Sequence, residues 1–260
     1  MRSDPATGLD ARPTTLVSGA IVPHAPVLLP PVSGDENAAR TAAVRKAIAG
    51  LEFGEVEAIL LLSPHGSRTG VYRSTAGSLA AFGLRGIRAT HPTVDGIVSN
   101  LSSAWDRPIL EGPVDHGVLV PLLSLCPAAP VVAASLRETS SFDRGSVERC
   151  VGEGRAFIDA AYRLSGRRVA FVASCNTGAG LTPRAPLTEV SRAVELEERL
   201  ASDLDRGALS RDLAIEVGCA GSCAAGTLAA FAAAFGGRQI QVQAHDAPFG
   251  VGYLVASALA

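Results

Sequence analysis

Hydrophobic residues along this chain gather in short continuous runs, and these runs alternate with longer segments of helical periodicity. Runs at 16–22, 56–62, 131–136 and 168–174 predict strands buried on both faces, because each is almost uniformly apolar rather than alternating. Residues 238–244 alternate between apolar and polar positions, which predicts a further strand with one exposed face.

Segments with helical periodicity lie between these runs. Apolar residues at helical spacing predict helices at 35–51, 93–105, 146–164 and 188–204, and an almost wholly apolar helix at 223–235. A buried helix is expected at 118–126, with Pro121 in its first turn and His116 just before it. We expect residues 66–92 to form an irregular excursion from the sheet with one short hairpin near Val71. A short segment is expected at 211–218.

Strands that alternate with helices predict an α/β fold: a single three-layer α/β/α domain with a mostly parallel or mixed central sheet. We expect this domain to span residues 14–260, since no internal repeat or long linker divides the chain. Residues 1–13 are polar and lack the apolar core of a signal peptide. They predict a disordered tail and a cytoplasmic protein.

Composition excludes several classes of function. The formal net charge of the 260-residue chain is -2 and aromatic residues make up only 5% of it, so neither a basic surface nor stacking platforms for nucleic acid are expected. No apolar run reaches the roughly 18 residues that a membrane span requires. The five cysteines match no zinc-finger spacing, although Cys219 and Cys223 form a C-x3-C pair, a weak indication of metal binding.

Histidines follow two of the predicted buried strands. Pro23 and Pro26 flank His24 and lack backbone donors, so the chain must leave the sheet at that histidine. His65 stands in the same way in Ser-Pro-His-Gly after the second strand. Ligands of α/β proteins bind at the carboxyl ends of the strands, and imidazole is a common ligand of transition metals. The alternative is that His24, His65 and His116 are loop residues that only complete hydrogen bonds.

Four motifs carry a resemblance to a known family: IVPHAPVLLPPVSG, LLLSPHG, VDHGVLVPL and APFGVGYLVA. In this order, from residue 20 to 256, they resemble the LigB-type class III extradiol ring-cleavage dioxygenases. The resemblance implies a non-haem Fe(II) held by two histidines and a carboxylate, with a small aromatic catechol and O2 as substrates. His24 and His65 match the metal ligands, His116 matches an acid/base histidine, and Asp115 is a candidate to orient it.

The chain departs from that family pattern at two positions, one for an acid/base residue and one for a metal ligand. Aligned on Ser174 and on residues 181–183, the chain has Ala179 where relatives carry a second acid/base histidine. An ungapped alignment places Cys219 at the position of the carboxylate ligand, with Glu216 three residues earlier as the other candidate. Two imidazoles and a thiolate would favour zinc over iron and would resemble the Memo-type relatives of this fold.

One residue could compensate for the missing histidine. His245 precedes Asp246 near the expected ligand edge and could serve as a substitute base, or the pair could simply lock its loop. Two hypotheses therefore remain open: an iron-dependent extradiol dioxygenase, and a metal-binding protein, with zinc as one option, that has lost ring cleavage and acts by ligand or partner recognition. Metal-assisted hydrolysis is a third, weaker option, and a homo-oligomer is one option for assembly.

Overall fold

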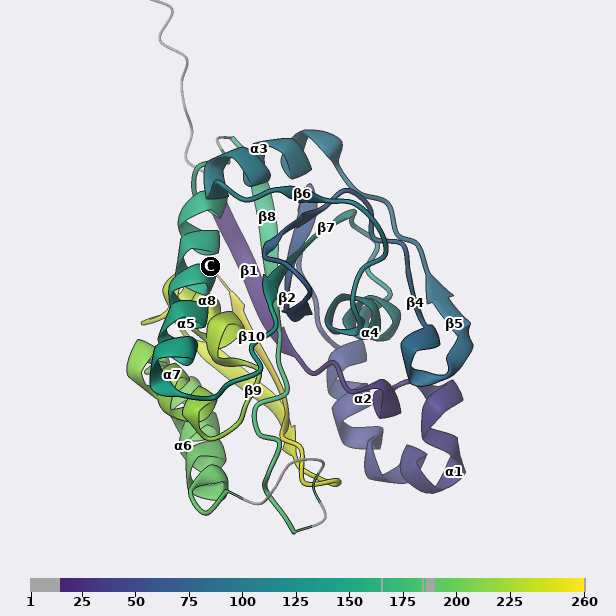
Figure 1. Ribbon diagram of the computed structural model, residues 1–260, viewed down its shortest axis with the longest axis vertical. Coiled ribbons are helices and arrows are strands. Elements are labelled where there is room, and N and C mark those ends of the chain that lie inside the picture. The colour runs from purple at the N-terminus through teal and green to yellow at the C-terminus, as the bar shows by residue number, and fades with distance from the viewer. Residues whose placement is uncertain (1–14, 165, 184, 186–189, 260) are drawn as a thin grey trace, which may run out of the picture.

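An eight-stranded mixed sheet runs through the computed structural model, which describes residues 15–164, 166–183, 185 and 190–259. The strands follow the spatial order β6-β3-β7-β2-β8-β1-β10-β9. Figure 1 shows the central strands β7, β2, β8 and β1 next to one another. Their bounds are β1 Thr15–Val22, β2 Ala58–Gly66, β3 Gly70–Tyr72, β6 Ile109–Leu110, β7 Val131–Arg137, β8 Arg168–Ser174, β9 Ile240–Asp246 and β10 Tyr253–Leu259.

The centre of this sheet is parallel. β7, β2, β8 and β1 pair in parallel, whereas β10 is antiparallel to β1 and β9 to β10. Alternate residues of β2 contribute to opposite faces: Leu60 packs into one apolar core, and Ile59 and Leu61 into the other. Both faces are covered, so the continuous apolar runs that predicted buried strands are explained.

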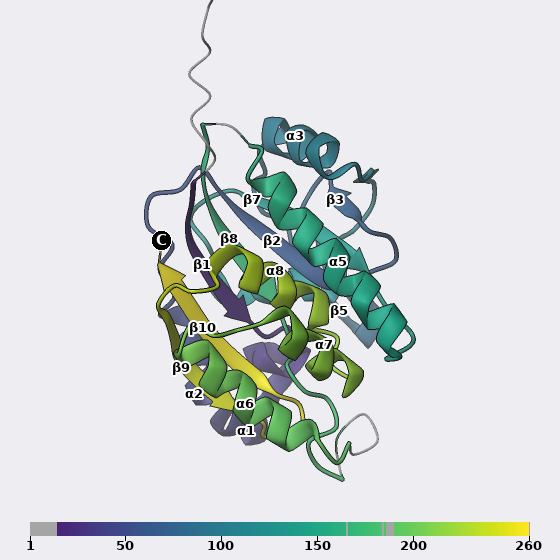
Figure 2. The same ribbon diagram turned by 90° about the vertical axis from the view of Figure 1, so that its left-hand side faces the viewer.

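Helices cover the two faces of the sheet and complete three layers (Figure 2). One face carries α3 Asp95–Trp105, α5 Arg144–Ala161, α6 Ala193–Asp205, α7 Arg211–Cys219 and α8 Ala225–Phe235. The other carries η1 Pro26–Leu28, α1 Pro30–Arg40, α2 Ala42–Ala49 and α4 His116–Leu125. The predicted α/β/α architecture is confirmed. Of the helices in the described residues, none is both long and apolar enough to cross a membrane.

Two helices approach each other closely through glycine. α5 packs across α8 at Gly154, where a Cβ atom would lie 1.9 Å from the carbonyl oxygen of Gly226. Gly152, two residues earlier on the same helix, has open space at its Cβ position. The contact between α5 and α8 therefore depends on the missing side chain at 154 and not at 152.

Several predicted boundaries differ from the structure. The helix expected at 35–51 is two helices, α1 and α2, which meet at Thr41. The excursion at 66–92 contains β3, which joins the main sheet, and a separate hairpin of β4 Gly77–Leu79 and β5 Leu84–Ala89 joined by η2 Ala80–Phe82. The helix expected from 188 is seen from Ala193; residues 1–13 and 186–189 lie outside the described residues.

Strand β2 also continues further than predicted, through Pro64 and His65 to Gly66. Its pairing with β8 ends at Leu62, so Pro64 lies where no partner on that side needs its missing N–H group. The strand therefore tolerates the proline and carries His65 to the edge of the sheet.

Candidate metal centre

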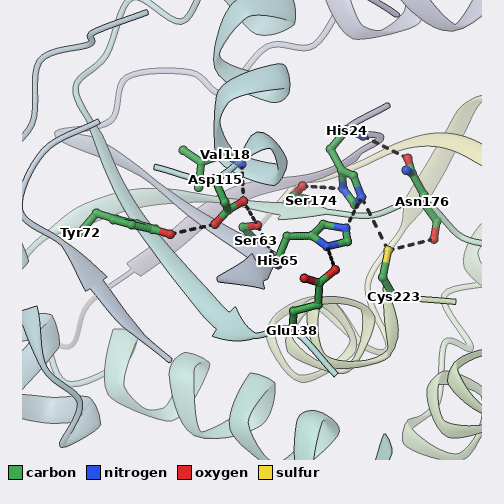
Figure 3. Close-up of polar contacts among 10 residues, drawn as sticks. All are labelled: His24, Ser63, His65, Tyr72, Asp115, Val118, Glu138, Ser174, Asn176 and Cys223. Atoms are coloured by element: carbon green, nitrogen blue, oxygen red, sulfur yellow. Dashed lines mark hydrogen bonds and ion pairs between the residues drawn. The ribbon is translucent and has the colours of Figure 1, made fainter. Parts of the chain in front are cut away.

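The carboxyl ends of three parallel strands bring distant side chains together (Figure 3). His24 follows β1, His65 is the second-last residue of β2, and Asn176 follows β8. The Nε2 atoms of His24 and His65 are 3.0 Å apart. The prediction that these two imidazoles converge is confirmed.

Hydrogen bonds fix the tautomer of the fully buried His24. Its Nδ1 lies 2.9 Å from the Ser174 hydroxyl oxygen, and that hydroxyl donates its hydrogen to the carbonyl oxygen of Gly117 at 2.6 Å. Because Ser174 has no second hydrogen, it must accept from His24, so Nδ1 is protonated and Nε2 keeps its lone pair. The Nε2 atom is then available as a metal ligand.

The Gly117 carbonyl is free for this bond because of Pro121. Pro121 lies four residues further along α4 and has no N–H group to donate to that carbonyl. Sequence analysis placed this proline in the first helical turn, where it would be harmless, but α4 begins at His116 and Pro121 is inside the helix. Ser174 donates to the Gly117 carbonyl the hydrogen bond that residue 121 of a regular helix would donate.

His65 is oriented in the same manner by a carboxylate. Its Nδ1 donates to Oε1 of Glu138 at 2.8 Å, which again leaves Nε2 directed at the centre. A carboxylate on the far nitrogen of a ligating histidine fixes the ring and raises its basicity. The Nε2 atoms of the two imidazoles thus point toward each other, and that of His24 keeps its lone pair.

Cys223 supplies a sulfur atom at this point. Its Sγ lies 3.6 Å from Nε2 of His24 and 3.8 Å from the backbone oxygen of Asn176. The Asn176 side-chain oxygen accepts the backbone N–H of His24 at 3.1 Å, and its backbone oxygen accepts the Ser222 hydroxyl at 3.0 Å. Asn176 therefore joins the segment of His24 to the segment of Cys223.

His116 is the third imidazole of the cluster. Its ring centroid lies 4.3 Å from that of His65 and 5.5 Å from that of His24, and Phe82 approaches it from another side at 5.0 Å. Among the described residues, none forms a hydrogen bond to the His116 ring. His24, His65 and His116 form a group that could hold a metal ion, with ligand atoms all within 4.8 Å of one another.

The three imidazoles of the cluster differ in their pKa values. Burial, and then the proximity of His65 and His116, lowers the pKa of His24 well below its usual value. Burial also acts to lower the pKa of His65, but Cys223 and Glu138 outweigh it and raise that pKa to about 9. Burial and His65 lower the pKa of His116 to about 4. The surroundings of His65 therefore stabilise positive charge, whether a proton or a metal ion.

The donor geometry fits a metal ion. With metal–nitrogen bonds of about 2.1 Å and metal–sulfur bonds of about 2.3 Å, tetrahedral ligand atoms lie roughly 3.4 Å apart for two nitrogens and 3.6 Å for nitrogen and sulfur. The observed separations are 3.0 Å and 3.6 Å. In the metal-free protein a proton on Nε2 of His65 can bridge the two nitrogens as a hydrogen bond of 3.0 Å. A metal ion would replace that proton, with the sulfur of Cys223 beside Nε2 of His24 as a further candidate donor.

A cavity of about 290 Å³ opens beside these donors. Its walls combine the polar groups of the centre with apolar side chains, among them Pro64, His116, Phe142, Ala179, Cys223 and Val251. This volume is close to the lower end of the range for small-molecule sites. Ala179 lies on the wall, so the position where the resembled family has a histidine faces the cavity without a proton-transfer group.

The structure assigns Asp115 a different role from the predicted one. Its carboxylate accepts from the Ser63 hydroxyl at 2.5 Å, from the Tyr72 hydroxyl at 2.9 Å and from the backbone N–H of Val118 at 3.2 Å. Asp115 is thus the N-cap of α4 and ties that helix to β2 and β3. It positions His116 through the backbone of the helix rather than through the imidazole ring.

Cys219 and Glu216, the predicted third ligands, lie elsewhere. Cys219 is exposed at the end of α7. The Glu216 carboxylate forms ion pairs with Arg192 and Arg199 on the surface. α7 continues through both positions, and the chain turns only afterwards, so Cys223 rather than Cys219 reaches the centre. Neither predicted third ligand therefore lies beside His24 and His65.

His245, predicted as a substitute base, pairs with another residue. Its Nε2 lies 3.1 Å from Oε1 of Glu197, which also accepts the hydroxyl of Thr177. This side chain is not among the walls of the cavity beside the metal donors. The pair links β9 to α6, whereas the Asp246 carboxylate accepts the backbone N–H of Ala247. The structure therefore shows a His245–Glu197 pair and not the expected His245–Asp246 pair.

Sequence analysis missed four residues of the centre: Glu138, Ser174, Asn176 and Cys223 as a donor. Glu138 comes directly after the buried strand β7, and Asn176 lies two residues after the end of β8. The rule that selected His24 and His65, a polar residue just beyond a buried strand, would have selected both of them.

Comparisons with known proteins show the fold and no more. No family model and no curated protein matches the chain. A solved structure titled "Crystal structure of uncharacterized protein JW3007 from Escherichia coli K12" is similar, with a TM-score of 0.59 and 16% identity over 93% of this chain and 99% of that one. The match extends over nearly the whole of both chains, in agreement with a single α/β architecture.

Proposed function

We propose that this protein is a metalloprotein in which His24, His65 and Cys223 bind one divalent ion, with zinc as the resident metal, and in which the adjacent cavity binds a small ligand. The observation that supports this most is the sulfur of Cys223 at 3.6 Å from Nε2 of His24. A thiolate in place of a carboxylate makes the donor set softer, and softer sets select zinc over an oxygen-activating iron.

The residues around the centre suggest what each would do. Ser174 and Glu138 orient the two imidazoles, and Asn176 keeps the Cys223 segment against the His24 segment. A bound metal would supply a Lewis acid for an oxygen atom of the ligand. Burial and His65 lower the pKa of His116, which keeps its ring neutral, and the ring nitrogens have no protein partners among the described residues, so His116 can form a hydrogen bond to a ligand in the cavity.

Metal content after purification without added metal tests the proposal. We expect about one zinc per chain, retained by Cys219→Ser and largely lost by Cys223→Ser. The two cysteines form a matched pair, because they lie four residues apart and only one contacts a histidine. Equal zinc in both variants, or stoichiometric iron in the wild type, would refute the assignment.

Extradiol cleavage of a small catechol with O2 is the second candidate. The motif order from residue 20 to 256 favours it, and so does an imidazole, His116, beside the two histidine donors and the cavity. Protein loaded anaerobically with Fe(II) should then consume O2 with a catechol panel and release a yellow ring-opened product. No O2 uptake with iron demonstrably bound would leave the zinc proposal alone.

A further inference from the structure

A second cavity, of about 390 Å³, lies on the face of the sheet covered by η1, α2 and α4. None of its lining residues also lines the cavity beside the metal donors. Its apolar walls come from Leu28, Leu29 and Pro30 at the start of α1 and from Leu123 on α4. The volume lies within the range of small-molecule sites.

Two cations of α2, Arg45 and Lys46, also line this cavity, and no acidic residue does. Neither forms an ion pair with any of the described residues, whereas Arg73, Arg107, Arg144 and Arg167 each pair with a glutamate. Arg45 donates only to the backbone oxygen of Ala38, at 3.2 Å. The cavity thus combines an apolar wall with uncompensated positive charge.

Unsatisfied polar atoms occur at the same place. Four side-chain nitrogen or oxygen atoms of the described residues are buried without a hydrogen-bond partner, and two of them belong to Arg45 (Nε) and Ser124 (Oγ), which both line this cavity. A buried polar group without a partner costs free energy. The Ser124 hydroxyl is thus a polar group of the cavity lining that has no protein partner.

We propose that this cavity binds an apolar monocarboxylate, with the carboxylate between Arg45, Lys46 and Ser124 and the hydrocarbon body against Leu28, Leu29 and Leu123. Planar guanidinium groups pair well with carboxylates, and aliphatic walls remove the chain of the ligand from water. The site is independent of the metal centre, so it can exist whatever ion His24 and His65 bind.

The sequence offers an unusually clean test, because Lys46 is the only lysine of the 260 residues. An amine-reactive acylating reagent can modify only Lys46 and the N-terminal amine, and mass spectrometry separates the two. We expect saturating decanoate to slow the modification of Lys46 about tenfold and leave the N-terminal amine unaffected, whereas decanol should give little protection. Equal rates with and without decanoate, or equal protection by decanol, would overturn the proposal.

Calorimetric titration with decanoate gives a second readout. Lys46→Gln should weaken binding about tenfold, as expected for one charge-assisted hydrogen bond. Leu123→Trp should abolish binding by filling the cavity, and Arg85→Gln, on the exposed strand β5, should leave it unchanged. Cys223→Ser should bind decanoate like the wild type. Loss of binding in that variant, or no binding by the wild type, would show that no separate acid site exists.

Discussion

The Nε2 atoms of His24 and His65 lie 3.0 Å apart although 41 residues separate them in the chain. Parallel pairing of β1 and β2 with the same strand, β8, brings their carboxyl ends to one edge of the sheet. The remaining nitrogen of each ring is held by its own partner, Ser174 or Glu138. The topology of the sheet therefore creates the donor pair, and the outer hydrogen bonds orient it.

Replacement of Glu138 by glutamine should weaken metal binding about 10- to 100-fold, the usual effect of losing an outer carboxylate. The glutamine oxygen can still accept from His65, but the negative charge that supports a cation is gone. Competition with a chromogenic chelator measures this affinity. Glu111→Gln, whose carboxylate pairs with Arg73 on the surface, is the control and should bind metal normally. Unchanged affinity in Glu138→Gln would exclude this role.

Ser174→Ala should also weaken metal binding, because His24 loses the acceptor that keeps hydrogen on Nδ1. The Gly117 carbonyl would lose its donor as well, since Pro121 cannot supply one. We expect a loss of about 1–3 kcal/mol in the free energy of unfolding for the unsatisfied groups. Denaturant titration of the metal-free protein and chelator competition separate the two effects. A variant with normal stability and normal affinity would contradict the hydrogen-bond chain.

Gly154→Ala and Gly152→Ala should act in opposite directions. At 154 the new Cβ would lie 1.9 Å from the backbone oxygen of Gly226, so α5 and α8 must separate, at a cost of about 1–3 kcal/mol or more. At 152 the Cβ enters open space in the middle of a helix, where alanine is favoured over glycine by up to about 1 kcal/mol. Thermal unfolding of both variants provides the measurement; equal effects would refute the close contact.

The pair of His245 and Glu197 predicts a pH dependence of stability. The hydrogen bond that His245 donates to the Glu197 carboxylate raises the pKa of His245 in the folded protein. Since the folded pKa exceeds the unfolded value of about 6.5, the pair stabilises the fold fully below that pH, and the contribution is lost as the pH rises through the folded pKa. The difference in unfolding free energy between wild type and His245→Gln should therefore be larger at pH 5.5 than at pH 9. A constant difference would show that the pair is not ionic.

The fold and two of the three proposed donors, His24 and His65, could be predicted from the sequence. Continuous apolar runs marked the parallel strands, and β8 begins and ends where its run does. Prolines next to histidines marked His24 and His65, since proline ends regular pairing at the point where a side chain can face the crevice. These signals are local, and the topology of an α/β sheet turns them into a site.

The third donor and the roles of Pro121 and His245 depend on where α7 ends and on contacts between residues distant in the chain. A motif alignment could not show that α7 runs through Cys219 and that the following turn delivers Cys223, four residues later. The role of Pro121 depends on Ser174, which lies 53 residues further along the chain, and no local pattern links them. The role of His245 could not be predicted for the same reason, because its partner Glu197 lies 48 residues earlier in the chain, on α6.

X-ray absorption spectroscopy of the zinc-loaded protein tests the central claim most directly. The account predicts two imidazole nitrogens at about 2.0–2.1 Å and one sulfur at about 2.3 Å from the zinc, with the sulfur contribution absent in Cys223→Ser and intact in Cys219→Ser. A shell of nitrogen and oxygen atoms without sulfur in the wild type would contradict the assignment of Cys223 as a metal ligand.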